Sequence, residues 1–153
     1  MKHHISKLTD PLLSDMPATG RGLVRLGIDL AHIPRIRESL ARFGDSFEHR
    51  LFTPEEIAYA RAAPALHAER LAARFAAKEA TIKALSLADA GVNWREMEVV
   101  READGHCHMR LHGRVLDIAR TAGVDRLLLS LTHDGDYAAA VVGVLSDKVE
   151  PAG

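Results

Sequence analysis

An alanine-rich segment between residues 67 and 85 contains three charged side chains whose spacing is suited to chemistry. Glu79 and Lys83 are four residues apart, so they share one face of a helix. Lys78 falls within an apolar stripe of that helix, where an ammonium group must reach solvent or find an anion. Lysine binds phosphate as a point charge, and Mg²⁺ prefers one or two carboxylates together with phosphate oxygens. The spacing therefore allows either a site for a polyanion and its metal, or an ordinary intrahelical ion pair beside a lysine that reaches solvent.

Two further candidates stand where apolar segments end. Asp29 lies near the end of the strand-like run 23–30, where an acid either takes part in chemistry or caps the next helix. His133 follows a second apolar run and precedes an Asp-Gly turn, a place typical of a turn histidine. Both can act with the alanine-rich helix if the fold brings these segments together.

Local signals predict the elements that would position these residues. The run 23–30 predicts a strand, and Pro34 suits the first turn of a short helix over 35–43. Thr53 is a capping residue followed by Pro and then Glu at the spacing of a capping box, so a second helix begins there. A third, long helix is expected over 67–85, because alanine favours helix.

The second half of the sequence is rich in strand signals. Two Asp-Gly pairs, each between two apolar runs, predict two hairpins, and a helix stopped by a glycine is expected between them. The expected strands and helix are 96–101, 106–112, 114–122 (the helix), 127–132 and 137–145.

These elements predict an α+β fold in a single domain, with a mostly antiparallel sheet packed against a long helix and shorter helices. The nearly all-apolar run 138–142 is expected to be buried on both faces. The domain is expected over 21–148. Residues 1–20 are expected to form a mobile N-terminal extension, and 149–153 a C-terminal tail.

Composition limits the classes of function. Lys and Arg total 20 against 21 Asp and Glu, a formal net charge of −1, which disfavours broad attraction to nucleic acid or membranes. No apolar run approaches the roughly 20 residues of a membrane helix, and the N-terminus lacks the apolar core of a signal peptide. Cys107 is the only cysteine, so no internal disulfide can form. We therefore expect a cytoplasmic protein without nucleic-acid or membrane partners.

Five short motifs occur in an order that resembles the holo-acyl-carrier-protein synthases, the small 4′-phosphopantetheinyl transferases. Residues 27–29 (Gly-Ile-Asp), running on to Arg35, look like the first signature of that family, and 74–80 (Arg-Phe-Ala-Ala-Lys-Glu-Ala), followed by Lys83, are similar to the second. The three further matches are Arg50-Leu51-Phe52-Thr53 with Glu55 or Glu56, Trp94 with Met97-Glu98-Val99, and Leu129-Ser130-Leu131-Thr132-His133. The resemblance spans about Leu23 to Leu145. It implies transfer of the phosphopantetheine arm of coenzyme A to a serine of an acyl carrier protein, with release of 3′,5′-ADP.

The resemblance also implies roles for the charged residues. Asp29 and Glu79 would bind Mg²⁺ together with the coenzyme pyrophosphate. Either Glu79 or a metal-bound water would accept the serine proton. Lys83 would stabilise or protonate the departing nucleotide phosphate.

The remaining implied contacts are with the nucleotide and the carrier protein. Arg74, Lys78, Lys83 and His133 would bind coenzyme A. Arg35, Arg37 and Arg42 would receive an acidic helix of the carrier protein, although a solvated helix face is an equally good interpretation of the last two. A homotrimer with its site between subunits is implied as well.

The segment 86–90 departs from the resemblance, because similar enzymes usually have a glycine-containing loop there, near the adenine and ribose of the coenzyme. Here the first glycine is Gly91. The segment either continues the long helix or forms a loop further from the nucleotide, and both predict a higher KM for coenzyme A. Two other functions stay open: a non-catalytic relative that binds coenzyme A or a carrier protein, and a Mg²⁺-dependent phosphohydrolase on another α+β fold.

Overall fold

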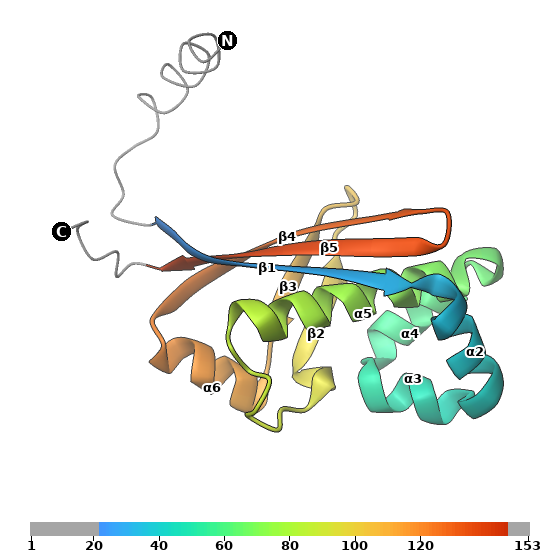
Figure 1. Cartoon of the computed structure of the whole chain (residues 1–153), viewed down its shortest axis with the longest axis horizontal. Helices are drawn as coiled ribbons and strands as arrows, with labels where there is room; N and C mark the ends of the chain where they lie inside the picture. Colours follow the sequence, from blue (N-terminus) through green and yellow to red (C-terminus); the bar gives the residue numbers. More distant parts are fainter. Residues whose placement is uncertain (1–21, 147–153) are drawn as a thin grey trace, which may run out of the picture.

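A computed structural model describes residues 22–146 of the chain, and Figure 1 shows how its elements are arranged. The predicted extension over 1–20 and the tail over 149–153 lie outside the described residues. The elements are β1 (Gly22–His32), α2 (Ile33–Phe43), α3 (Asp45–Leu51), α4 (Pro54–Arg61), η1 (Pro64–Leu66), α5 (His67–Ala84), η2 (Trp94–Glu96), β2 (Met97–Arg101), β3 (Cys107–Leu111), α6 (Gly113–Thr121), β4 (Val124–Asp134) and β5 (Tyr137–Ser146).

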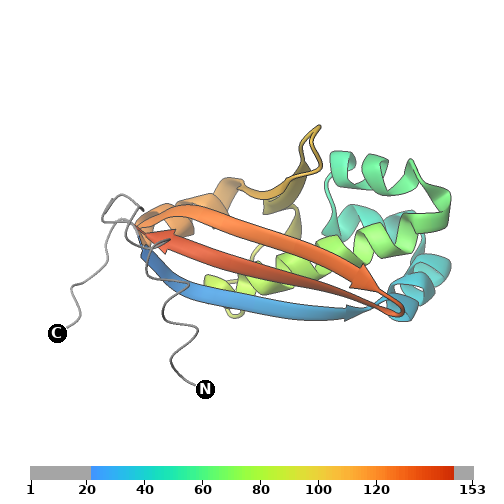
Figure 2. The ribbon, with the colours of Figure 1, turned by 90° about the horizontal axis from the view of Figure 1, so that it is seen from above.

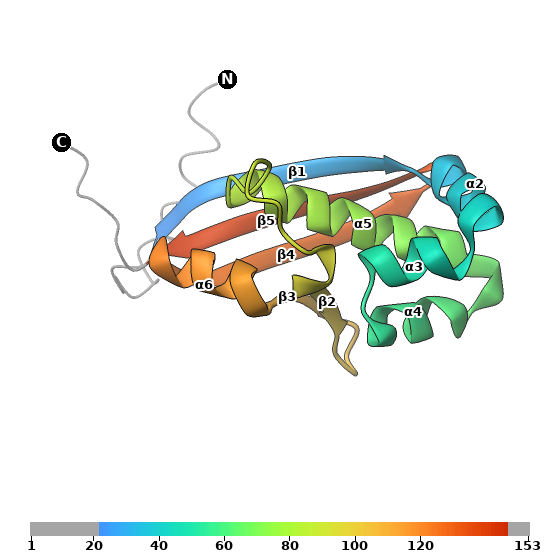
Figure 3. The ribbon, with the colours of Figure 1, turned by 90° about the horizontal axis from the view of Figure 1, so that it is seen from below.

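Strands β1, β5 and β4 form an antiparallel sheet in that order, and β2 and β3 form a separate antiparallel pair. The register places Asp29 opposite Ala140, which is in turn opposite Leu131. Helix α5 lies along one face of the larger sheet, and Figure 3 shows the other helices and the β2–β3 hairpin on that same side. The predicted α+β class with antiparallel sheets is therefore confirmed.

The opposite face of the sheet is apolar and open. Figure 2 shows that no described helix or strand covers it. On β1, Leu26, Ile28 and Leu30 are 64%, 65% and 61% exposed, whereas Gly27 and Ala31, which alternate with them, point to the other face and are buried. Within residues 22–146, one side of the sheet thus forms the core and the other presents aliphatic side chains to solvent.

Close packing of β1 on α5 depends on small residues. Ala80 and Ala84 of α5 are buried, and Gly27 of β1 lies directly against them. A Cβ atom at Gly27 would stand 2.9 Å from the carbonyl carbon of Ala80 and 3.0 Å from Cβ of Ala84, with the Ala80 carbonyl oxygen closer still. Only glycine permits this approach of strand to helix.

Most of the predicted elements are present. Thr53 forms the predicted capping box, since its Oγ1 accepts from the Glu56 amide at 3.3 Å and its own amide donates to Oε1 of Glu56 at 3.0 Å. The long helix, both hairpins and the helix between the hairpins are confirmed within a few residues. No helix among residues 22–146 is long and apolar enough to cross a membrane.

One element was missed and one expectation was wrong. Helix α3 (Asp45–Leu51) was not predicted, because it has only seven residues and no side-chain cap at Gly44. The run 138–142 was expected to be buried on both faces, but Val141 is 40% exposed on the open side of the sheet. An apolar strand sequence alone does not distinguish burial within one chain from an apolar face left open by it.

Candidate active site

The register of β1 on α5 brings Asp29 to Lys83. Nζ of Lys83 donates to Oδ1 of Asp29 at 3.0 Å and to the backbone oxygen of Ile28, also at 3.0 Å. The side chain of Asp29 is 16% exposed and that of Lys83 is 54% exposed, so the pair lies at the surface with the carboxylate on its inner side. Two residues 54 positions apart in sequence, both candidates for the site, thus form one ion pair.

Glu79 lies next to this pair on α5. Partial burial raises the pKa of the Glu79 carboxyl above its usual value; the negative charge of Asp29 raises it further and Lys83 lowers it. Because the charges of Asp29 and Lys83 both act on this carboxyl, Glu79 lies within electrostatic range of the two. We refer to Asp29 and Glu79 as the acid pair.

The acid pair suits a hard divalent cation. Within the described part of the chain, no group of three or more His, Cys, Asp or Glu side chains is arranged so that it could hold a metal ion by itself. A cation at the acid pair would therefore complete its coordination with substrate oxygens and water. Mg²⁺ is commonly bound by one or two carboxylates and substrate phosphates, so this donor set fits it.

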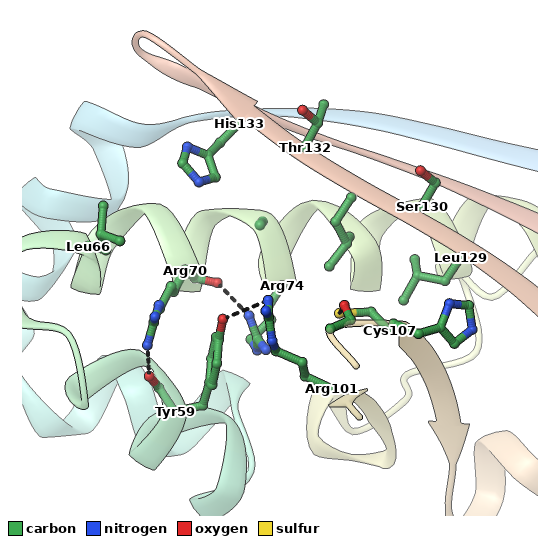
Figure 4. A pocket seen from close by; sticks show the side chains of 14 residues that line it. Tyr59, Leu66, Arg70, Arg74, Arg101, Cys107, Leu129, Ser130, Thr132 and His133 are labelled. Atoms are coloured by element: carbon green, nitrogen blue, oxygen red, sulfur yellow. Dashed lines mark hydrogen bonds between the residues drawn. The ribbon is translucent and has the colours of Figure 1, made fainter. Parts of the chain in front are cut away.

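A second feature is a cavity of about 500 Å³ between α4, α5, the β2–β3 hairpin and β4 (Figure 4). Three guanidinium groups surround the ring of Tyr59: those of Arg70 and Arg74 lie 4.1 and 4.2 Å from its centre, and that of Arg101 lies 5.6 Å away. His133 of β4 lines the same cavity. We refer to this space as the arginine cavity.

Arg74 is the most constrained of these cations. It is 4% exposed, and burial lowers its pKa, although nearby Glu56 opposes this effect. Nη1 of Arg74 donates to the backbone oxygen of Arg70 at 3.3 Å, but its buried Nε has no hydrogen-bond partner within residues 22–146. A buried donor without a partner is costly, so an anion in the cavity would relieve this cost. Arg74 and His133, predicted to bind the nucleotide, do line one cavity.

Lys78 is placed differently from the expectation. It is fully buried, and its Nζ donates to Oε1 of Glu56 at 2.7 Å and to the backbone oxygens of Leu51 and Trp94 at 2.8 and 3.1 Å. The ammonium group therefore neither reaches solvent nor faces the arginine cavity. Lys78 therefore pairs with Glu56 of its own chain and holds α5 to α4. It does not make the expected contact with nucleotide phosphates.

The three arginines predicted to receive the carrier protein are all exposed on α2, but they differ. Arg35 and Arg42 line a shallow hollow beside Phe43, which is 55% exposed. Arg37 instead forms an ion pair with Glu69 of α5. This partner on its own chain makes Arg37 less available than the other two.

The segment after α5 is a loop, so the first of the two alternatives for 86–90 is excluded. The helix ends at Ala84, and Ser86 takes φ 57°, the left-handed conformation that stops a helix. Leu87 is 2% exposed and packs into the core.

The acid pair and the arginine cavity lie on opposite sides of α5. Arg74 and Lys83 are nine residues apart, which places them on opposite faces of the helix, about 13 Å apart along its axis. Asp29 is on β1, one edge strand of the sheet, and His133 is on β4, the other edge strand. None of Asp29, Glu79 and Lys83 lines the cavity. One chain therefore presents two half-sites that face different ways.

Three cavity residues were not predicted from the sequence: Tyr59, Arg70 and Arg101. Arg70 could have been found, because it is one helical turn before Arg74 and shares its face. Tyr59 and Arg101 come from separate elements, and no spacing in the sequence connects them with α5.

Comparison with known proteins gives a consistent result. A family model described as the 4′-phosphopantetheinyl transferase superfamily matches residues 25–142. A protein named holo-[acyl-carrier-protein] synthase from Koribacter versatilis is 45% identical over 122 residues, covering 79% of this chain and 96% of the relative. The ACPS–CoA complex from Chronobacterium ammoniagenes has a TM-score of 0.70 and 38% identity, over 78% of this chain and 95% of that one. A Helicobacter pylori holo-[acyl-carrier-protein] synthase in complex with coenzyme A has a TM-score of 0.68 and 27% identity, over 78% of this chain and 98% of that one.

Proposed function

The chain belongs to the holo-[acyl-carrier-protein] synthases of the 4′-phosphopantetheinyl transferase superfamily, and from this membership we propose a Mg²⁺-dependent reaction that releases 3′,5′-ADP. The arm of coenzyme A passes to a serine hydroxyl of an apo acyl carrier protein. The serine oxygen forms a bond to the phosphorus of the arm, and the anhydride bond between that phosphorus and the nucleotide breaks. We also place the enzyme in the cytoplasm.

The observation that supports this proposal most directly is the ion pair of Asp29 with Lys83 at the contact of β1 and α5, with Glu79 one helical turn before Lys83. The acid pair would hold Mg²⁺, which would neutralise charge on the pyrophosphate as it reacts. Lys83, half exposed beside Asp29, is placed to stabilise the departing phosphate. The proton leaves the serine either to Glu79 or to a water at the acid pair.

The arginine cavity suits the nucleotide phosphates. The orphan Nε of buried Arg74 and the ring of His133 are the groups that we assign to them, and Arg70 and Arg101 add positive charge to the same space. Lys78 has no part in this assignment, because Glu56 already neutralises it in the core.

The carrier protein is assigned to the exposed face of α2. Arg35 and Arg42 line a shallow hollow of about 270 Å³ together with exposed Phe43 and with Glu38, the one acidic side chain of its lining. An acidic, amphipathic helix would match both the charge and the apolar side chain.

A homotrimer would unite the two half-sites. We propose that the open face of the β1–β5–β4 sheet is the subunit interface, because its aliphatic side chains otherwise remain in solvent. The acid pair of one subunit would then meet the arginine cavity of its neighbour. Native mass spectrometry tests this point, and Ile28→Glu, which puts a charge on the open face, should yield monomers.

The test of the function is direct transfer. The protein is incubated with coenzyme A, Mg²⁺ and apo carrier proteins of fatty-acid, polyketide and peptide-synthetase type, and mass spectrometry detects a carrier heavier by one phosphopantetheine arm. Asp29→Ala and Glu79→Ala should each lower the rate on the order of a thousandfold. Asp117→Ala, which removes an exposed carboxylate on α6, is the matched control and should leave the rate unchanged.

The alternative functions give different products. Binding of coenzyme A without any modified carrier would indicate a non-catalytic relative. Release of inorganic phosphate without 3′,5′-ADP would indicate a phosphohydrolase. Near-normal turnover of either alanine variant with Mg²⁺ would contradict the assignment of the acid pair.

A further inference from the structure

We propose that Arg25, held in place by Ser86, is a further binding residue for the anionic nucleotide half of coenzyme A. This inference rests on the proposed function and adds to it a contact that none of the sequence motifs includes. The contact lies on the same side of β1 as Asp29, four residues before it, at the end of α5 that is remote from Arg74.

The position of Arg25 follows from the register of β1. Arg25, Gly27 and Asp29 alternate along the strand and pair with Val144, Val142 and Ala140, so all three face α5. The register shifts immediately before Arg25, a bulge of the kind that redirects side chains near functional sites.

Arg25 meets the end of α5 one turn beyond Lys83. Its Nη1 donates to Oγ of Ser86 at 2.6 Å. Lys83 in turn donates to Asp29. Side-chain hydrogen bonds of Arg25 and of Lys83 therefore join β1 to the C-terminal end of α5 at two points. Both cations lie on the side of the strand that also bears Asp29.

The unusual backbone conformation of Ser86 indicates that its contact with Arg25 is not incidental. Leu87 N donates to Ile82 O at 2.9 Å and Ser86 N to Lys83 O at 3.3 Å, the two bonds of a Schellman turn. Ser86 occupies the left-handed position that glycine usually takes there, and among residues 22–146 it is the one non-glycine residue with positive φ. Serine at that position costs backbone energy that glycine would not. What serine supplies in return is the hydroxyl that holds Arg25.

The charge on Arg25 is available for a ligand. Arg25 is exposed, and no carboxylate among residues 22–146 forms an ion pair with it, whereas Lys83 is paired with Asp29. A guanidinium has five N–H donors in a planar fork, and the bond to Ser86 uses one of them. The remaining donors suit a phosphate oxygen pair, which a fork binds in bidentate fashion.

Calorimetry with 3′,5′-ADP, in the presence of Mg²⁺, tests the contact without requiring turnover. Arg25→Gln should weaken binding of 3′,5′-ADP about tenfold and raise the KM for coenzyme A by a similar factor, with kcat unchanged. Arg25→Lys should retain part of the affinity, because it keeps the charge and loses the fork. Arg95→Gln on η2 is the matched control, since it removes an exposed arginine next to Trp94, which packs on Phe75 of α5, about three helical turns before Ser86.

Ser86→Gly separates a binding role from a structural one. Glycine relieves the backbone cost, so the melting temperature should rise, while the loss of the hydroxyl should weaken 3′,5′-ADP binding. An Arg25→Gln variant with unchanged affinity for 3′,5′-ADP would overturn the proposal, as would a raised KM confined to the carrier protein. Because 3′,5′-ADP binding is measured apart from transfer, absence of transfer by the unaltered protein would count against the proposed function instead.

Discussion

Gly27→Ala should disable the acid pair by displacing β1 from α5. The added Cβ would lie 2.9 Å from the carbonyl carbon of Ala80 and 3.0 Å from Cβ of Ala84, and closer still to the carbonyl oxygen of Ala80. Because these contacts are helix backbone and a methyl group, no flexible side chain can move aside. Ordinary contacts begin near 3.4 Å, so strand and helix must separate by roughly 1 Å.

The size of the effect follows from that displacement. Overpacking of this kind costs about 1–3 kcal/mol of folding free energy, which lowers the melting temperature by about 2–12 °C for a chain of this size. Asp29 is two residues along β1 from Gly27, whereas Glu79 and Lys83 are on α5, so the displacement separates the carboxylate from its partners. A misplacement of about 1 Å at reacting groups can lower the rate about a hundredfold.

The assay compares transfer rates and melting curves of Gly27→Ala and Gly143→Ala. Gly143 of neighbouring β5 is opposite Leu26 on the open face. A Cβ there would meet the end of the Leu23 side chain, which can move, and would add one methyl group to a surface that is already aliphatic. We expect the Gly143 variant to keep its activity and the Gly27 variant to lose about two orders of magnitude in kcat/KM while remaining folded. A Gly27→Ala protein with kcat/KM within a few-fold of the unaltered enzyme would refute the reasoning.

Other predictions concern the core, acid stability and partner choice. Lys78→Met should cost about 3–5 kcal/mol in urea unfolding because it leaves the Glu56 carboxylate buried and unpaired, and the double variant with Glu56→Leu should recover part of the loss. Burial raises the pKa of Glu98, but hydrogen bonds from Thr53 and a histidine outweigh it, so the pKa lies below its usual 4.5. The stability that this carboxylate adds is complete above pH 4.5 and is lost as pH falls through the lowered pKa, so Glu98→Gln should flatten the fall in unfolding free energy on acidification. Arg35→Glu should raise the KM for the carrier protein, less so at high salt, and leave the KM for coenzyme A unchanged; an equal rise in both would place Arg35 at the nucleotide.

The parts of the fold that could be predicted are those with strong local signals. The capping box at Thr53, the Asp-Gly hairpins and the alanine-rich helix each depend on a few neighbouring residues. The meeting of Asp29 with Lys83 could also be anticipated, but only through the resemblance, because 54 residues separate the two. Spacing within one helix says nothing about which strand packs against it.

The parts that could not be predicted depend on contacts between distant elements. The position of Lys78 in an apolar stripe was compatible with an ammonium group that reaches solvent or one that pairs with an anion. The structure shows the second, because Glu56 of another helix binds it. The arginine cavity likewise requires Tyr59 of α4 and Arg101 of β2 to meet α5. Such contacts arise from tertiary packing, which leaves no periodic pattern in the sequence.

The opposed orientation of the two half-sites about α5 has a genetic consequence. In a trimer whose active centres draw on adjacent subunits, a chain with Asp29→Ala and a chain with Arg74→Ala are each inactive alone, yet each retains the half that the other lacks. Co-assembled in equal amounts, they should rebuild an intact centre at about one quarter of the subunit boundaries. Activity should therefore return when the two single variants are co-expressed, or when they are unfolded together and refolded. A chain that carries both Asp29→Ala and Arg74→Ala should restore activity to neither single variant.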